Sequence, residues 1–355
     1  MAVTKEEFHK IYKEQLEPVL KKLEEERVIE DSKNNKIIKP LLLIGCVAFI
    51  MIFVLNSVND SLAIVCFFIV FFTIFPVGYI LNKSHEKRRK FLKERVFPKI
   101  LSLHGQFYFS QNSKAITLVD INRKMGLYNL STTKTDDDTV VGIYKGCNLL
   151  INECKLTHTT SNGKSTRTVT DFNGLIIKIQ MKKNFKGVTI LGSSDNIRKL
   201  KGFENVELES VDFMQNRKVY STDQIEARYL LTTAFMERLQ SVSECFTKNR
   251  VDKISSISSA NTIAIVEQAK EIPFIGNALE KRMFNIAAAF IEGYIYVFIN
   301  TFEDFFDVDL IAPIFGGDQK KYTLLDEDKY YNIYNQLSAI LGIIDYLKLD
   351  MDLGL

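Results

Sequence analysis

Two apolar stretches near the N-terminus constrain the fold of this chain more than any other feature. The first covers residues 37–55 and is interrupted only by Lys39 and Pro40; the second covers residues 62–81 and carries no charge. At about 1.5 Å per residue, a helix of this length spans about 30 Å, the thickness of the hydrocarbon core of a bilayer. The sequence therefore predicts a hairpin of two transmembrane helices. The alternative is a hydrophobic helical hairpin buried in a soluble domain, although a soluble helix would carry more polar residues.

The two stretches divide the chain into six segments. These are a cytoplasmic amphipathic helix (1–36), the first transmembrane helix (37–55), an external loop (56–61), the second transmembrane helix (62–81), a basic juxtamembrane helix (82–110) and a cytoplasmic α+β domain (111–355). Lys and Arg residues flank both stretches, whereas the loop between them has neither. Because basic residues stay on the cytoplasmic side, we expect a multi-pass protein of the inner (plasma) membrane with both termini in the cytoplasm.

Helices are also expected on the cytoplasmic side of both stretches. Residues 4–30 carry apolar side chains at helical spacing, and Pro18 should kink this helix or restart it after Glu17. A second helix, over about residues 84–103, shows the same spacing, with Pro98 as its kink. Since both helices leave the membrane on the same side, we expect them to pack together as a stalk. The apolar stripe of the first helix is Phe8, Tyr12, Leu16, Val19 and Leu23.

The rest of the chain has the pattern of an antiparallel meander packed with helices, which predicts an α+β fold. Strands are expected over residues 148–160, 175–181 and 188–191, with hairpin turns at Asn162-Gly163 and Asn173-Gly174. A second hairpin joins residues 284–291 to 294–300 through Glu292-Gly293. One helix should begin with Ser221 as its N-cap and continue to about residue 239, and the last should cover about 326–347.

Residues 219–239, which read VYSTDQIEARYLLTTAFMERL, resemble a bacterial membrane-anchored family known as domain of unknown function 3137. Thr233 stands where many relatives have proline. The resemblance implies an N-terminal helix, a two-span hairpin and a soluble mixed domain, and it implies no activity. Four further segments support it: Phe172-Asn173-Gly174-Leu175, Asn184-Phe185-Lys186-Gly187, Ala288-Ala289-Phe290-Ile291 and Phe302-Glu303-Asp304-Phe305-Phe306.

Two groups of residues are candidates for binding. The first is a recognition surface, whose alternative role is helix capping and ion pairing between helix and sheet; it consists of Asp223, Gln224, Glu226, Arg228, Glu237 and Arg238. The second is a basic cluster expected to contact lipid headgroups at about 1 kcal/mol per residue; it consists of Lys83, Lys87, Arg88, Arg89 and Lys90.

Other patterns predict structure rather than chemistry. Asp136, Asp137 and Asp138 are expected in a solvated turn, because they lack the alternating ligands of a calcium loop. Cys147, Cys154 and Cys245 match no zinc spacing and are expected as single buried thiols. The four histidines have no local partner at ligand spacing, and the acids at 303, 304, 307 and 309 fit a solvated helical turn. No metal and no cofactor is expected.

These patterns favour a membrane-tethered cytoplasmic interaction or scaffold module over an enzyme. The expected partners are the lipid bilayer, a membrane or cytoplasmic protein, and a second copy of the chain as a homo-oligomer. Nucleic acid is excluded, because the soluble part has no basic stripe interleaved with aromatic residues. The alternative function is a membrane-surface enzyme that uses carboxylates in a pocket of the α+β domain.

Overall fold

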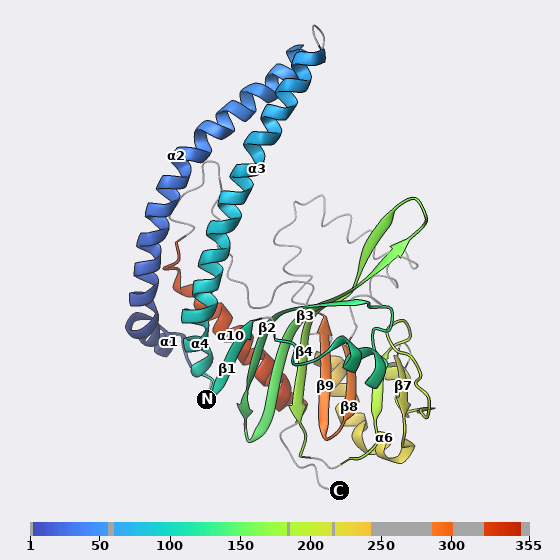
Figure 1. The fold of residues 1–355 in the computed structure, drawn as a ribbon. Helices are drawn as coiled ribbons and strands as arrows, with labels where there is room; N and C mark the ends of the chain where they lie inside the picture. The colour runs from blue at the N-terminus through green and yellow to red at the C-terminus, as the bar shows by residue number, and fades with distance from the viewer. Residues whose placement is uncertain are drawn as a thin grey trace. The chain divides into compact units, whose positions relative to one another are not determined.

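The computed structural model describes residues 3–55, 60–111, 113–182, 185–214, 217–242, 286–300 and 323–348. The chain forms two compact units (Figure 1). A helical unit contains residues 1–103 and 307–335, and a sheet unit contains residues 104–306 and 336–355. The predictions for Cys245, for residues 248–282 and for the acids between 303 and 309 lie outside the described residues.

The helical unit is built around two long helices that lie side by side (Figure 1). Its elements are α1 (Lys5–Ile11), η1 (Tyr12–Leu16), α2 (Glu17–Leu55), α3 (Asp60–Phe91), η2 (Leu92–Val96), α4 (Phe97–Ser102) and the first part of α10 (Glu327–Tyr346). The expected amphipathic segment and the first apolar stretch therefore share one helix, and α3 continues through the second stretch into the basic segment. The helical part ends at Ser102, in agreement with the helix predicted over about residues 84–103.

Proline disturbs both helical runs through a π-helical turn. Pro18 follows η1 and Pro98 follows η2, each at the second position of the next α-helix. A proline ring clashes with the carbonyl four residues earlier and lacks an N–H donor. A wider turn at that point moves the carbonyl aside, and such single turns are the usual form of the π-helix. The predicted perturbations at Pro18 and Pro98 thus take this form.

The apolar stripe of the N-terminal helix is buried in the helical unit, with Leu20 rather than Val19 as its fourth member. The stripe packs against α10: the rings of Tyr12 and Tyr330 stack with centroids 6.1 Å apart, and Tyr12 Oη donates a hydrogen bond to the Leu325 carbonyl at 2.8 Å. Burial raises the pKa of Tyr12 to about 12. The predicted stalk is confirmed, with α10 as a component that helical spacing alone did not assign to it.

Both long helices contain segments that are long and apolar enough to cross a membrane, by length and composition. These segments are hardly covered by protein, since 17% of the apolar window of the first helix and 11% of that of the second are buried. A core helix of a soluble protein is mostly buried.

The described residues of the sheet unit form nine strands in the order β1-β2-β3-β4-β9-β8-β5-β7-β6, and the pairings among them are antiparallel (Figure 1). They are β1 (Phe107–Gln111), β2 (Thr133–Tyr144), β3 (Cys147–Ser161), β4 (Thr166–Gln180), β5 (Thr189–Ser193), β6 (Glu204–Asn205), β7 (Arg217–Ser221), β8 (Ile286–Ile291) and β9 (Tyr294–Asn300). The predicted α+β class is confirmed, and the predicted meander is confirmed where β3 and β4 pair as a hairpin. The predicted strand 188–191 forms as β5, but it pairs with β7 and β8 instead of following β4. The turns at Asn162-Gly163 and Glu292-Gly293 are confirmed too, with positive φ at Gly163, Glu292 and Gly293.

The central strands are buried on both faces. Ile176 and Phe298 point into a cluster covered by the segment that carries η3 (Asp120–Lys124), whereas their neighbours Ile177 and Val297 are buried on the opposite face. A sheet covered on both faces has strands that read as nearly continuous apolar runs. The sequence of β8 and β9 has this character.

Two predicted turns are wrong. Asn173-Gly174 lies inside β4, where Gly174 pairs with Cys154 on one side and Asn300 on the other. Asp136 to Asp138 lie inside β2, at a β-bulge, and Asp138 is fully buried. In both cases pairing with neighbouring strands overrides a local turn preference.

The helix predicted after β7 begins at a different residue in the structure, and it is interrupted in its middle. Asp223, not Ser221, is the N-cap of α6 (Gln224–Leu230): its carboxylate accepts hydrogen bonds from the backbone N–H groups of Ile225 and Glu226. The Ser221 hydroxyl instead donates to backbone carbonyls. Leu231 leaves the helical conformation, and a second helix occupies residues 233–242 after Thr232. Thr233 therefore holds the first helical position, where proline is readily accepted.

Candidate functional site

A network of ion pairs and hydrogen bonds links the segment before α10 to α2 and α3 at the base of the helical hairpin. The backbone N–H of Leu324 donates to Glu24 Oε2 at 3.1 Å. Arg27 holds the same carboxylate through Nε at 2.8 Å and Nη2 at 2.7 Å. Arg27 Nη1 also donates to Asp31 Oδ2 at 2.9 Å, and Arg88 of α3 binds the other oxygen of Asp31. Two positive and two negative side chains are therefore linked across three segments.

This network is largely shielded from solvent. The side chains of Arg27 and Arg88 are 10% and 8% exposed. Burial by itself would raise the pKa of Glu24, but hydrogen bonds from Arg27 and Leu324 and the charge of Arg27 hold that pKa below its usual value. The hydrogen bond to Glu24 raises the pKa of Arg27. Both groups are therefore ionised at neutral pH, and the pairs are intact there.

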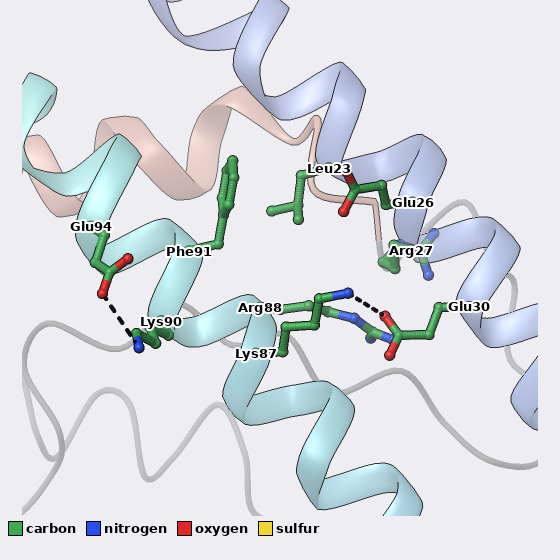
Figure 2. A pocket seen from close by; sticks show the side chains of 9 residues that line it. All are labelled: Leu23, Glu26, Arg27, Glu30, Lys87, Arg88, Lys90, Phe91 and Glu94. Carbon is green, nitrogen blue, oxygen red and sulfur yellow. Dashed lines mark ion pairs between the residues drawn. The ribbon is translucent and has the colours of Figure 1, made fainter.

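A cleft opens beside this network, between α2 and α3 (Figure 2). Its volume is about 190 Å³. Two ion pairs border it, Lys87 with Glu30 at 3.7 Å and Lys90 with Glu94 at 3.8 Å. Its lining consists of Leu23, Glu26, Arg27, Glu30, Lys87, Arg88, Lys90, Phe91 and Glu94.

The residues predicted to contact lipid headgroups therefore have different surroundings. Lys83, Lys87 and Lys90 are exposed, and Lys83 lies over the ring of Tyr79. Arg88 is enclosed and bound to Asp31, so it does not belong to a solvated basic surface. The partner of Arg88 is 57 residues away in sequence, and no local pattern indicates it.

The predicted recognition surface centres on Glu226 of α6. Its two carboxylate oxygens accept the backbone N–H groups of Lys186 at 2.7 Å and Gly187 at 2.5 Å. Gln224 donates to Glu204 at 2.6 Å, and Arg228 donates to the carbonyl of Gln224 at 3.1 Å. Asp223 and Glu226 thus cap a helix and anchor a turn. Glu237 and Arg238 lie on the next helix, over 233–242.

Gly187 leaves room for this carboxylate. A Cβ at position 187 would lie 2.5 Å from Glu226 Oε2 and 3.1 Å from Thr222 Oγ1. We expect Gly187→Ala to lower the free energy of unfolding of the sheet unit by about 1–3 kcal/mol, because the Glu226 carboxylate must move away from the backbone N–H groups that it binds. Thermal unfolding followed by circular dichroism measures the change.

Gly342→Ala is the matched control for Gly187→Ala. Gly342 lies exposed in α10 with no atom within 4 Å of the added Cβ. Alanine there should stabilise the helix by up to about 1 kcal/mol. Equal effects of the two substitutions would contradict a specific role for Gly187.

A buried polar cluster occupies the bulge between β2 and β3. Lys134 pairs with Asp136 and donates to Asn152 Oδ1 at 2.9 Å. Asn152 Nδ2 in turn donates to Asp136 and to Thr139 Oγ1, both at 3.0 Å. The charges balance and their hydrogen bonds are made within the cluster, so it stabilises the irregular strand.

A second polar group joins the β3–β4 hairpin to the segment before β2. Asp171 accepts a hydrogen bond from Ser131 Oγ at 2.6 Å, and His158 Nδ1 lies 2.8 Å from the same carboxylate. The carboxylate stands between the serine and the histidine, whereas nucleophilic catalysis places the histidine next to the serine. The arrangement therefore holds two segments together. The sequence shows no signal for it, because the pairing depends on strand register.

The cysteines and possible metal ligands add no reactive site to the described residues. Cys147 and Cys154 are buried free thiols, as predicted. Burial raises the pKa of the Cys154 thiol to about 12, so it is protonated and inert at neutral pH. Within the described ranges, no three His, Cys, Asp or Glu side chains gather as a metal site.

Comparison with known proteins yields one family and one structure. The family model described as "Protein of unknown function (DUF3137)" matches residues 170–272, which include α6 and Gly187. The crystal structure of the mycobacterial trehalose monomycolate transport factor A, TtfA, is 12% identical; the match covers 72% of this chain and 97% of that chain, with a TM-score of 0.30. A likeness at this level carries no argument about function. No curated protein matches the sequence.

Proposed function

We propose a function from the geometry of the helices, because the family model that matches residues 170–272 describes a protein of unknown function. The protein is a membrane-tethered interaction or scaffold module. α2 and α3 cross the inner membrane, and the α+β domain stays in the cytoplasm as the part that meets a partner protein.

The exposed apolar surface of the hairpin carries this proposal. Leu43 is 67% exposed, and Phe72 and Phe75 are each 70% exposed. Soluble monomers rarely expose contiguous apolar patches larger than a few hundred square ångströms. Hydrocarbon around α2 and α3 removes these side chains from water, at about 25 cal/mol per Å².

The distribution of charge supports the orientation. Basic residues stand at the ends of the apolar segments that lead to the two cytoplasmic helices, and the connection between the segments has no Lys or Arg. The positive-inside rule therefore supports a cytoplasmic position for both termini and for the sheet unit.

The acidic residues whose pKa is shifted take part in hydrogen bonds and ion pairs. The pKa values of Glu7, Glu17, Glu24 and Asp120 are all shifted downward. The described carboxyl groups with a shifted pKa therefore act as anions in hydrogen bonds and ion pairs.

Tryptophan fluorescence tests the membrane anchor, because the natural chain has no tryptophan. We expect the single tryptophan of Phe72→Trp, reconstituted in bilayers, to be strongly quenched by lipids brominated on their acyl chains. Ile225→Trp is the matched control, since Ile225 is 83% exposed on α6 of the sheet unit and should not be quenched. Equal quenching of the two variants, or none at Phe72→Trp, would refute the anchor.

A further inference from the structure

The sheet formed by the described strands has two edges, and they differ in their protection against pairing with another chain. One edge is β6, which is two residues long and contains the charged Glu204. The other edge is β1, which is five residues long, reads FYFSQ and carries neither a charge nor a proline. Natural proteins protect an edge by short length, charge or proline, because its outer N–H and C=O groups are open to a further strand. The edge at β1 lacks these three protections.

An apolar row of side chains leads across the sheet to this edge. On β5 and β8 the row is fully buried, at Ile190 and Ala289. It continues through β9 and β4 to Leu150, which is half-buried, and then to Val141 and Tyr108, which are 42% and 75% exposed. A strand face of an antiparallel sheet that meets water usually carries polar residues. The apolar end of the row therefore indicates a contact surface at β1 and β2.

The lack of charge on β1 favours an identical strand as its partner. An uncharged edge does not select a partner by opposite charge, and two identical uncharged strands set no like charges against each other. A two-fold axis perpendicular to the sheet relates two adjacent strands in the antiparallel orientation, which makes the contact isologous. In the register centred on Tyr108, the two Tyr108 rings lie opposite each other, and Phe107 lies opposite Phe109 on the other face. Cross-strand aromatic pairs each contribute about 0.2–1 kcal/mol.

We propose that the protein binds a second copy of itself through antiparallel pairing of the two β1 strands, with the two Tyr108 side chains opposite each other at the two-fold axis. Val141 and Ile143, both exposed on β2, then flank the aromatic pair on each side. The inference deepens the proposed function, since it names a second copy as a partner of the sheet unit. It rests on that function only for the tether, because the pairing itself requires only the folded sheet unit.

The size of the contact determines its strength. A contact through one five-residue strand is small beside the standard interface of about 1,600 Å². We therefore expect a reversible dimer whose population depends on concentration. Attachment of both copies to one membrane raises their effective concentration and favours the pair.

Photo-crosslinking at the two-fold axis tests the geometry. We expect p-benzoylphenylalanine at position 108 of the full chain, in neutral detergent, to form a covalent dimer under ultraviolet light. Mass spectrometry of a mixture of ordinary and ¹⁵N-labelled chains should place the crosslink in β1 or β2 of the other copy. The matched control is the same amino acid at position 346, because Tyr346 is 50% exposed at the end of α10 in the same unit. That chain should stay uncrosslinked.

Charge at the axis tests the association itself. Tyr108→Lys sets two like charges opposite each other and should raise the Kd of the dimer by at least about tenfold, measured by sedimentation of the full chain in detergent. Tyr346→Lys adds the same charge away from the edge and should leave the Kd unchanged. An equimolar mixture of Tyr108→Lys and Tyr108→Glu should associate again, because opposite charges then meet at the axis. This recovery also shows that both variants fold.

Four results would overturn the proposal. They are a full chain that stays monomeric at all concentrations, equal effects of Tyr108→Lys and Tyr346→Lys, a charge-swapped mixture that does not associate, and a crosslink from position 108 to a segment outside β1 and β2. The brominated-lipid experiment with Phe72→Trp decides the anchor separately. Failure of the dimer and failure of the anchor are therefore distinguishable.

Discussion

Asp31→Ala is expected to lower the local stability of the helical hairpin by about 3 kcal/mol. Asp31 accepts hydrogen bonds from both Arg27 and Arg88, whose side chains are almost completely buried. Removal of one partner from a buried pair costs about 3–5 kcal/mol, because a charge is left uncompensated. The expected value is at the lower end of this range, because Asp31 is itself about a quarter exposed. Hydrogen exchange of the backbone amides of α2 and α3 measures the local opening free energy.

Two variants distinguish the buried pair from a general charge effect. Glu25→Ala removes an exposed acid on the same helix and should change stability by less than about 0.5 kcal/mol. Asp31→Ala/Arg88→Met removes both charges across the two helices and should recover most of the loss, since an apolar replacement of a buried pair is often neutral. Equal effects of Asp31→Ala and Glu25→Ala would show that the network contributes nothing.

Phe298→Ala is expected to lower the free energy of unfolding of the sheet unit by about 3–5 kcal/mol. Phe298 is fully buried on β9, where its ring lies 5.8 Å from that of Phe172 and 5.7 Å from that of Tyr128. Alanine would leave a cavity where three strands and the covering segment meet. Thermal unfolding, followed through the near-ultraviolet signal of the aromatic residues, measures the loss.

Tyr128→Phe is the matched control in the same aromatic cluster. Burial raises the pKa of Tyr128, and its hydroxyl has no hydrogen-bond partner in the described part of the chain. Removal of that hydroxyl should leave stability unchanged or raise it by about 1 kcal/mol, because an unsatisfied polar atom is removed while the ring stays. Strong destabilisation by Tyr128→Phe, or a small effect of Phe298→Ala, would contradict this account of the core.

Local signals predicted those parts of the fold in which neighbouring residues decide the conformation. Asn162-Gly163 and Glu292-Gly293 form turns, because the strands on either side pair with each other. Asn173-Gly174 has the same signal but lies inside a strand, because β9 and β3 occupy its two sides. The two cases differ in their strand partners, which are distant in sequence. The turn preference of two adjacent residues carries no information about such partners.

The same limit applies to the candidate sites. Asp223 caps a helix through contacts two and three residues away. Helix capping is the alternative role that the sequence predicts for this residue. Glu226, in contrast, binds backbone groups 39 and 40 residues away. His158 and Asp171 meet only through the register of β3 and β4. Spacing indicates neighbours along one element, and it does not indicate which elements come together.

The sequence by itself determined the two long apolar helices, the stalk that continues from them and the antiparallel character of the sheet. These follow from periodicity and from turn residues, both of which act over a few positions. Tertiary structure alone decided that Arg88 is enclosed beside Asp31, that three aspartates lie in a strand rather than in a turn, and that α10 completes the stalk. The reason is physical: burial and ion pairing depend on distances between segments that are far apart along the chain.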